Sequence, residues 1–510
     1  MEVQSSRFKV QSLKKQISVF LLLLLAIYYS PLAAQYITHG PVVGSVTSSS
    51  CKIYIRTKQC GKILMELSQT PDLQKAFSVA GVTDSLHDKS VMLQISSLNA
   101  NTKYYYRLLF EGREDVVKGS FRTFPAEGAK GDYSFVTGSC QETENMKVFE
   151  AMPKNDPYFL MHTGDFTYPD YMIARNYAAT QEGIDSSYRR RYNEKVMKHM
   201  LYNIPIDYMY DDDDYVGASA GRYCTNDLVS KRMNGKITYT MPADTFPALW
   251  RTNVIKGYAD YFPHYDLPDT TEGIFHSFKF GNAEFFVIDR NSAKDHPDGD
   301  VFKYNAKKHR WYFAPDSSIA LFGKKQMDWL KAAIKNSTAD WKFIVSGVPL
   351  NGACEKLIQA GVKIQKLHYK EWYGFHLASG FGHYWAGFPY ERNDFVSFVK
   401  QNNIKNVLVI SGDTHHCVMD DGKNSDFPEM NASGLSVSTT ELAKYIKLIG
   451  NGFGLYRFNK IWNRGGIGIS SKECKNGFGK VSIVKDEYVE MSIVDEDNKT
   501  ISSFKVPFSH

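Results

Sequence analysis

The sequence predicts a layered α/β domain preceded by a small all-β sandwich. Short alternating segments broken by turns fill residues 36–124, which is the pattern of antiparallel strands. From residue 132 onward, short apolar runs alternate with helical stretches, as in sheets whose strands are buried on both faces. We therefore expect one domain at residues 35–124 and a second at 132–510, joined by a turn-rich linker at 125–131.

Composition and charge narrow the class of protein. Of the 510 residues, 43% are hydrophobic and 23% are charged, which are globular values and exclude a wholly disordered or coiled-coil chain. The formal net charge is +6, from 61 basic and 55 acidic residues. Four of those basic residues and one acidic residue lie in the first 34 positions, so the remainder carries 57 minus 54, or +3. This balance is too weak to predict specific nucleic-acid binding.

The first 34 residues have the features of an export signal. Basic residues between Arg7 and Lys15 precede an apolar run at Ile17–Ala26, and small residues precede Gln35. We expect residues 1–34 to be removed and the protein to be exported to the periplasm or the extracellular space. An uncleaved anchor is the alternative, but a membrane span needs ~20 apolar residues. We therefore expect no transmembrane span after signal removal.

The first domain is predicted from its alternating strands. Residues 52–56 alternate polar and apolar side chains, and the stretch 98–107 resembles a strand entry of fibronectin type III-like domains. This resemblance implies a fibronectin type III-like sandwich. The expected strands are Cys51–Thr57, Lys62–Ser68, Val91–Leu98, Lys103–Glu111 and Gly119–Thr123.

The second domain is predicted from four apolar runs that each end in a polar cluster. Sites in α/β sheets form beyond the carboxyl ends of strands, so the four clusters should meet at one rim. Helices are indicated where apolar residues recur every four positions, as at Tyr188 and Tyr192 and at Leu330 and Ile334. Strands return after Gly479 and are expected to form a closing hairpin on the sheet. The four runs with their clusters are residues 133–140, 159–168, 206–215 and 407–416.

The clusters together offer a thiol, a phenol, carboxylates and imidazoles. Oxygen donors of this kind suit calcium or magnesium, and the softer donors suit iron or zinc. Each piece also has an ordinary explanation as a turn, a buried cysteine or a solvated acidic loop. However, the four successive carboxylates of Asp211–Asp214 follow an apolar strand, and they repel one another unless cations or protons are bound. The combination predicts a metal site.

Specific motifs add a resemblance to a known family. Gly164-Asp165-Phe166-Thr167-Tyr168 matches the GDxxY motif of calcineurin-like metallophosphoesterases. Gly138-Ser139-Cys140 at the start and Gly412-Asp413-Thr414-His415 at the end resemble the PhoD-like alkaline phosphatase D family, whose WDDHDY segment is similar to Tyr210–Tyr215. The resemblance implies a layered metallophosphoesterase β-sandwich flanked by helices. Weaker similarities, to the YRxxY, LDxR and LGxxQxxWL segments of the family, lie at Tyr188–Tyr192, Val287–Arg290 and Gly323–Leu330.

The resemblance also implies a ligand set and an activity. Cys140, Asp165, Tyr168 and His415 are expected to hold Fe3+. One or two further ions such as Ca2+ are expected at Asp165, Asp212 and Asp413, with Asp211 as an additional candidate and other divalent cations open. The implied enzyme is an exported phosphoric ester hydrolase, mono- or diesterase, in which a metal-bound hydroxide attacks phosphorus. Its substrate would be a small phosphate ester or a lipid head group.

Two residues are expected to act on the substrate. Arg189, or its neighbour Arg190, is predicted to contact the phosphate. Asp213 stands where the family carries the His that protonates the leaving group or contacts the phosphate. The departure at Asp213, and the loss of Asn residues around Ala218 and Ser219, leave a second hypothesis open: a non-catalytic exported protein that binds calcium at a degenerate site. Cys140 and His415 argue against it, because a structural calcium site needs neither thiol nor imidazole. A disulfide between Cys51 and Cys60 is expected from export and proximity alone.

Overall fold

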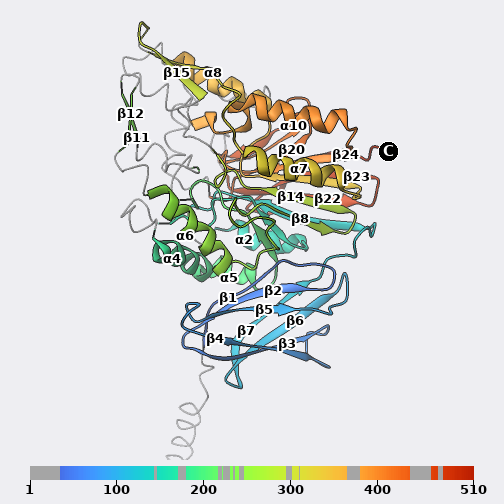
Figure 1. Cartoon of the computed structure of the whole chain (residues 1–510). Coiled ribbons are helices and arrows are strands. Elements are labelled where there is room, and N and C mark those ends of the chain that lie inside the picture. Colours follow the sequence, from blue (N-terminus) through green and yellow to red (C-terminus); the bar gives the residue numbers. More distant parts are fainter. Residues whose placement is uncertain are drawn as a thin grey trace, which may run out of the picture.

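Figure 1 shows a computed structural model of the chain, with a smaller blue domain beneath a larger one. The expected signal segment lies outside the described residues, as do Ala218 and Ser219. Within the described part, no helix combines the length and apolar character needed to cross a membrane. The structure describes residues 35–142, 146–169, 180–215, 221, 230–233, 236–239, 246–294, 301–308, 310–364, 380–436, 461–468 and 475–510.

The smaller domain consists of two antiparallel sheets, as the alternation predicts. One sheet has the order β1-β2-β5 and the other β4-β3-β6-β7. The sequence did not indicate β1, which contains a Gly-Pro pair, or β4, whose residues are largely exposed. An all-β sandwich is therefore present, and its fibronectin type III-like character stays a prediction. The strands are β1 (Ile37–Gly44), β2 (Cys51–Thr57), β3 (Gly61–Ser68), β4 (Phe77–Thr83), β5 (Ser90–Ile95), β6 (Lys103–Phe110) and β7 (Arg113–Arg122).

The expected disulfide in this domain is wrong. Cys51 and Cys60 are both free, and Cys51 is buried while Cys60 is exposed. Cys51 begins strand β2 and Cys60 follows its far end. Because an extended strand rises ~3.3 Å per residue, the two ends of the seven-residue β2 lie about 20 Å apart, and Cys60 follows the end opposite to Cys51. A disulfide needs Cα atoms less than about 7 Å apart.

The larger domain contains two main sheets, with strand orders β10-β9-β8-β22-β23-β24 and β13-β14-β17-β18-β20-β19-β21. The four apolar runs form strands β8, β9, β10 and β18, as predicted. The closing hairpin is also confirmed, because β22, β23 and β24 pair antiparallel beside β8. The strands of the first sheet are β8 (Asp132–Gly138), β9 (Leu160–His162), β10 (Ile206–Tyr208), β22 (Gly477–Val484), β23 (Tyr488–Asp495) and β24 (Thr500–Pro507). Those of the second are β13 (His276–Phe280), β14 (Ala283–Ile288), β17 (Trp341–Ser346), β18 (Val407–Ser411), β19 (His416–Asp421), β20 (Pro428–Ala432) and β21 (Gly466–Gly468).

Helices and shorter elements surround the two sheets. Figure 1 shows α7 and α10 together beside the seven-stranded sheet, and α4, α5 and α6 on the side nearer the sandwich. The helices are α2 (Val148–Ala151), α4 (Gln181–Asn193), α5 (Lys195–Leu201), α6 (Phe246–Tyr261), α7 (Gly323–Asn336), α8 (Glu355–Ile364) and α10 (Pro389–Gln401). The short elements are η1 (Met152–Asn155), η4 (Gly352–Cys354), η5 (Trp385–Gly387), β11 (Ser230–Met233), β12 (Lys236–Tyr239), β15 (Phe302–Asn305) and β16 (Arg310–Phe313).

Alternation along β14 divides its side chains between two cores. Phe285 points into the layer between the sheets, where its ring lies 5.1 Å from that of Phe135 on β8 and 4.7 Å from that of Phe343 on β17. Its neighbour Phe286 points to the other face and packs in the cluster that includes Leu330 of α7. Because side chains alternate with period two, each apolar strand serves both layers. The packing holds the two sheets face to face.

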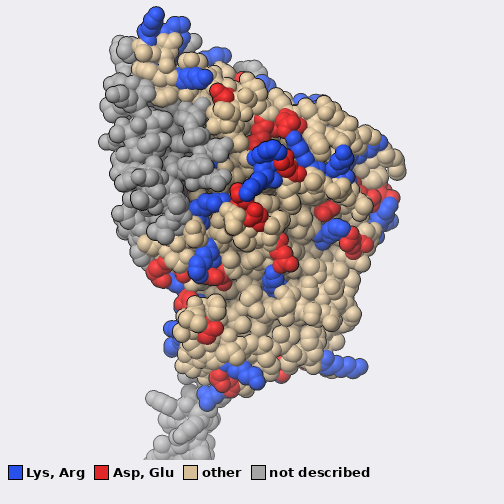
Figure 2. All heavy atoms as spheres, in the orientation of Figure 1, with Lys and Arg blue, Asp and Glu red and all other residues tan. Residues whose placement is uncertain are grey.

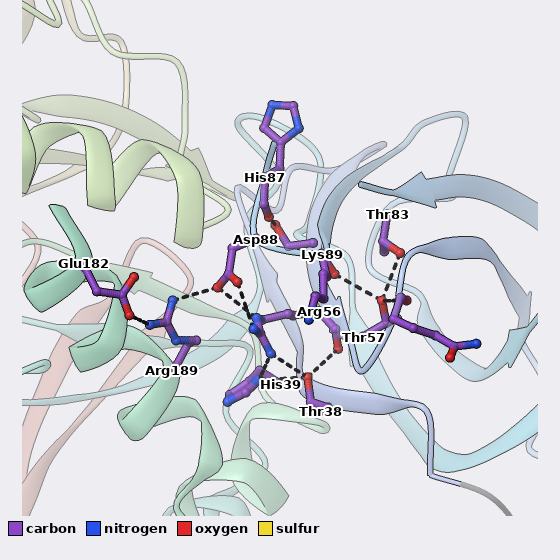
Figure 3. A network of polar contacts seen from close by, with 12 residues as sticks. Thr38, His39, Arg56, Thr57, Thr83, His87, Asp88, Lys89, Glu182 and Arg189 are labelled. Atoms are coloured by element: carbon purple, nitrogen blue, oxygen red, sulfur yellow. Dashed lines mark hydrogen bonds and ion pairs between the residues drawn. The ribbon is translucent and has the colours of Figure 1, made fainter. Parts of the chain in front are cut away.

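A polar network joins the sandwich to helix α4 (Figure 3). Asp88 of the sandwich accepts hydrogen bonds from Arg56 Nε and Nη2, both at 2.9 Å, from Arg189 Nη1 at 2.7 Å and from Tyr261 Oη at 2.6 Å. Burial alone would raise the pKa of Asp88, but the hydrogen bonds from Arg56 and Tyr261 outweigh it and hold the pKa well below its usual range. Elsewhere on the surface, Lys and Arg lie beside Asp and Glu (Figure 2), and such exposed pairs contribute only ~0–1 kcal/mol each.

The interdomain network gives a stability prediction. Asp88→Asn should lower the free energy of unfolding by about 1–2 kcal/mol at neutral pH, because it weakens charged hydrogen bonds that are partly exposed to solvent. The pKa of Asp88 is lower in the folded than in the unfolded chain, so the stabilisation is present above the unfolded value of ~3.9 and is lost as the pH falls. Urea unfolding of the wild type and of Asp88→Asn at pH 7 and pH 3 measures the loss of unfolding free energy, which should be smaller at pH 3. Asp266→Asn, which removes an exposed pair with Lys52, is the control; an equal effect at both pH values would contradict the assignment.

Candidate metal centre

The candidate site lies where strand ends from both sheets meet. Cys140 follows β8, Asp165 follows β9, and Asp211 and Asp212 follow β10, all in the six-stranded sheet. Asp413 follows β18 of the seven-stranded sheet. The carboxyl ends of parallel strands share one edge, and the packing of the two sheets brings both edges together. The predicted common rim is therefore present.

The loops of the site hold an uncommon backbone conformation. Positive φ angles occur at Cys140 (61°), Asp165 (55°), Tyr168 (45°), Asp413 (70°) and His415 (54°). The left-handed region is costly for side chains of this size, and such residues persist where the surrounding structure enforces them, often at functional sites. Here the neighbouring backbone holds the two loops in this conformation, because the peptide N–H of Gln141 donates to the carbonyl of Asp165 at 3.0 Å.

Two glycines allow the loops to approach one another. A Cβ on Gly164 would overlap the Cβ of Asp211, and a Cβ on Gly347 would lie 2.8 Å from the carboxyl carbon of Asp211. Gly164 also has a φ of 103°, which side chains rarely adopt. These positions let the Asp211 side chain enter between the β9 and β17 ends.

The donor atoms form three overlapping sets, each with its atoms within 4.8 Å of one another. Asp165 belongs to two sets, and Asp212 also belongs to two. Tyr168 lies beside the set that contains Cys140 and Asp165, because its hydroxyl is 3.4 Å from Asp165 Oδ2. All seven residues predicted as metal ligands are therefore close together. The sets are Cys140, Asp165 and His415; Asp165, Asp211 and Asp212; and Asp212, His383 and Asp413.

The protonation properties of this cluster fit cations. Burial, and then the neighbouring carboxylates, raise the pKa of Asp165 well above its usual range. Burial, and then the charge of Asp165, also raise the pKa of Cys140 and of Tyr168 well above their usual values. Burial lowers the pKa of His415 and so keeps its imidazole neutral, which is the form that binds metals. A positive ion among these groups lowers the raised pKa values again.

Two buried atoms of the cluster also lack hydrogen-bond partners. Asp211 Oδ2 and His415 Nδ1 have none within the described residues. Buried polar atoms in proteins are normally satisfied, so an orphaned carboxylate oxygen and an orphaned ring nitrogen in one cluster need an explanation. Metal ligation supplies one, and the residues present fit one or more bound cations.

The four successive carboxylates have different surroundings. Asp214 accepts hydrogen bonds from the peptide N–H groups of Phe166 at 2.8 Å and of Asp211 at 2.9 Å, so it ties the β9 loop to the β10 loop. Asp213 is partly exposed, and its peptide N–H donates to Asp165 Oδ1 at 3.1 Å. The side chains of Asp211 and Asp212 are buried in the donor sets. Sequence reasoning had not distinguished the anchoring role of Asp214.

Three consecutive arginines of α4 have separate partners. Arg189 donates hydrogen bonds to Asp88 of the sandwich and to Tyr261 at the end of α6, and its contact with the phosphate stays a prediction. Arg190 Nη2 donates to the carbonyl of Thr167 at 2.9 Å. Arg191 donates to the carbonyls of Gln141 and Phe166. The latter two arginines hold the loops that carry Cys140, Asp165 and Tyr168.

Sequence reasoning missed two residues of the site. Arg290, which follows β14, is fully buried and forms ion pairs with Asp211 and, at 3.6 Å, with Asp212. The similarity of Val287–Arg290 to the LDxR segment does not identify this role, although an arginine directly after an apolar strand is a usable signal. His383 lies with its Nε2 atom 2.6 Å from Asp413 Oδ2. It comes from a part of the sequence with no readable pattern.

Known proteins with related sequences and folds agree with this geometry. A sequence model described as PhoD-like phosphatase matches residues 135–445, more than half of the chain. Alkaline phosphatase D of Bacillus subtilis (strain 168) is 24% identical over 348 residues, which cover 64% of this chain and 53% of the relative. The chain thus spans about half the length of that curated relative in the match.

Solved structures show the same architecture. The structure of PhoD superimposes with a TM-score of 0.68 at 17% identity, covering 94% of this chain and 92% of the other. A purple acid phosphatase from yellow lupin (Lupinus luteus) seeds gives a TM-score of 0.54 at 11% identity, covering 92% and 74%. The chain therefore shares the fold of these two proteins, a mixed α/β architecture with several sheets. The chain belongs to the PhoD-like phosphatase family.

The Arg290–Asp211 pair gives a prediction for the cluster. Arg290→Met should lower the free energy of unfolding of chelator-treated protein by about 3–5 kcal/mol, because it leaves a buried carboxylate without its counter-charge. The double variant Arg290→Met/Asp211→Asn should recover much of that loss, since a neutral amide needs no counter-charge. Denaturant unfolding of the three proteins checks this. Additive losses in the double variant would show that the pair is not coupled.

Proposed function

We propose that this chain is an exported, metal-dependent phosphoric ester hydrolase, acting as an alkaline phosphatase or phosphodiesterase. The observation that carries the proposal is the convergence of a thiol, an imidazole, a phenol and several carboxylates around Asp165 at the joint edge of two sheets. Membership of the PhoD-like phosphatase family supports the reaction class. Export rests on residues 1–34 of the sequence alone.

Two groups of residues would hold different ions. Cys140, Asp165, Tyr168 and His415 would hold the first, for which thiolate and phenolate donors favour iron. Asp165, Asp212 and Asp413, with Asp211 as an additional candidate, would hold one or two further divalent cations such as Ca2+. When bound, such cations supply an activated water and neutralise charge on the phosphate oxygens. The substrates would be phosphate monoesters or diesters, either small molecules or lipid head groups.

The chain's own residues keep this arrangement ready. Arg290 partly offsets the effect of burial on Asp211, whose pKa is raised by burial and lowered by the guanidinium. Asp214 fixes the spacing between the loops through backbone N–H groups. Asp213 is held beside the cluster by its peptide N–H and is partly exposed, so its carboxyl group is the candidate donor of a proton to the leaving oxygen.

The rival function is a non-catalytic, calcium-binding exported protein. The presence of Asp213, where the related enzymes carry His, favours it. The set of Cys140, Asp165 and His415 opposes it, because calcium takes oxygen ligands and has no use for sulfur or nitrogen donors. We therefore retain the hydrolase as the proposal.

Metal content separates the two ions. Cys140→Ala should lose the iron and at least about 10²-fold of the rate of aryl phosphate hydrolysis above pH 7, because the first ion neutralises developing charge. Asp212→Ala should keep the iron and lose the divalent cation, since hard and soft donors select different metals. Elemental analysis of protein purified without chelator, with assays on aryl mono- and diesters, measures both. Cys51→Ala, which alters a buried thiol in strand β2 of the sandwich, is the control; unchanged metal content in the first two variants would refute the ligand assignment.

The role of Asp213 is tested through the leaving group. An ordinary Asp titrates near ~3.9 and donates protons poorly at alkaline pH, so Asp213→His should raise kcat for an alkyl phosphate more than for a nitrophenyl phosphate. General acid assistance of ~10²–10⁴-fold sets the upper scale of the gain. The assay compares both esters at matched metal content. Equal changes on the two esters would mean that position 213 does not transfer the proton.

A further inference from the structure

His383 occupies a fixed place beside the candidate centre. Trp385, two positions further along the chain, is fully buried in the hydrophobic cluster that includes Phe322. Its ring lies 4.6 Å from that of Phe322, and its Nε1 atom donates to Ser346 Oγ at 3.3 Å. The peptide N–H of Tyr384 donates to the carbonyl of Phe381, and the rings of His383 and Tyr384 lie 4.8 Å apart, edge to face. The segment that carries His383 is therefore anchored in the domain.

The imidazole points at two carboxylates from different strand ends. His383 Nε2 lies 2.6 Å from Asp413 Oδ2, and the side chains of these residues are only 7% and 10% exposed. A ring nitrogen of His383 and one carboxylate oxygen each of Asp413 and Asp212 lie within 4.8 Å of one another. One nitrogen and two oxygens thus converge from three separate segments of the chain. A simple surface ion pair would not include a second, buried carboxylate.

This donor set differs in chemistry from an all-oxygen site. Calcium takes six to eight oxygen ligands, whereas imidazole nitrogen suits zinc and iron. Two carboxylates and a neutral imidazole carry a charge that matches a divalent cation. Three protein ligands also leave coordination positions open, as in catalytic zinc sites.

We propose that His383, Asp212 and Asp413 together ligate the second cation, and that the ring nitrogen selects a divalent transition metal such as Zn2+ over Ca2+. This inference rests on the proposed function and changes the identity of its second ion. It assigns His383 to direct metal contact, as opposed to a hydrogen bond that only orients Asp413.

The test measures binding on the full chain with its iron retained. Isothermal titration with Zn2+ and with Ca2+ is run on the wild type, His383→Ala and His383→Asp. The wild type should bind one Zn2+ more tightly than Ca2+. Both variants should bind Zn2+ at least about tenfold more weakly, since loss even of an indirect partner costs that much. His383→Asp, which supplies oxygen in place of nitrogen, should narrow or reverse the preference.

Zinc-edge X-ray absorption identifies the ligands without relying on a variant. Wild-type protein with one equivalent of Zn2+ should show imidazole scattering and no sulfur shell at ~2.3 Å, which places the zinc outside the Cys140 set. His264→Gln, which alters a half-buried ring packed on Tyr258, should leave binding and spectrum unchanged.

The outcomes distinguish the inference from the proposed function. Zinc that binds without imidazole scattering, or equally well to the wild type and both His383 variants, would overturn the inference and leave a two-ion phosphatase intact. A wild type that prefers Ca2+ would also overturn it. A wild type that binds neither cation would overturn the inference and the proposed second ion together.

Discussion

Mutual repulsion among buried carboxylates is the constraint on which the rest of the site depends. The strand ends bring Asp165, Asp211, Asp212 and Asp413 into one cluster, and burial raises the pKa of Asp165 and of Asp211. Arg290 supplies one fixed positive charge, which is too little for so many carboxylates. The negative charge of the cluster thus exceeds the positive charge of Arg290, and bound cations would offset the remaining repulsion.

The loops that hold these carboxylates are supported from helix α4. Successive helical residues point about 100° apart, so Arg189, Arg190 and Arg191 face different directions. Arg189 reaches the sandwich, whereas Arg190 and Arg191 reach carbonyls of the β8 and β9 loops. One helix therefore contributes both to the contact with the sandwich and to the shape of the site. This gives the sandwich a physical connection to the centre without any side chain in it.

The sequence predicted those parts of the structure that follow from local patterns. Apolar runs ending in polar clusters located β8, β9, β10 and β18 and the rim at which they meet, because strand periodicity and parallel packing are properties of short segments. Strand β4 was missed because an exposed edge strand has no buried face to impose alternation. The Cys51–Cys60 disulfide was wrong because proximity in sequence ignored the length of the strand between them.

Residues that join the site through tertiary packing gave weaker signals. Arg290 could have been found, since a charged residue directly after a buried strand needs a partner. His383 could not have been found, because its position depends on Trp385, which packs in a core built from segments far away in the sequence. The pairing of Arg189 with Asp88 could not be found either, because Asp88 lies 101 positions away in the sandwich. Contacts of that range depend on how the domains pack.

Under the proposed assignment, shared ligands would couple the two ions. Asp165 belongs to the donor set of Cys140 and also to that of Asp211 and Asp212, and Asp212 belongs in turn to the set of His383 and Asp413. An ion in the Cys140 set would lower the pKa of Asp165 and relieve its repulsion of Asp212, so that the neighbouring carboxylates would be available in their charged form. Filling of the first set would thereby prepare the second. The softest donors lie at one end of this row and the mixed imidazole–carboxylate set at the other, so the two ends would differ in the metal that they prefer.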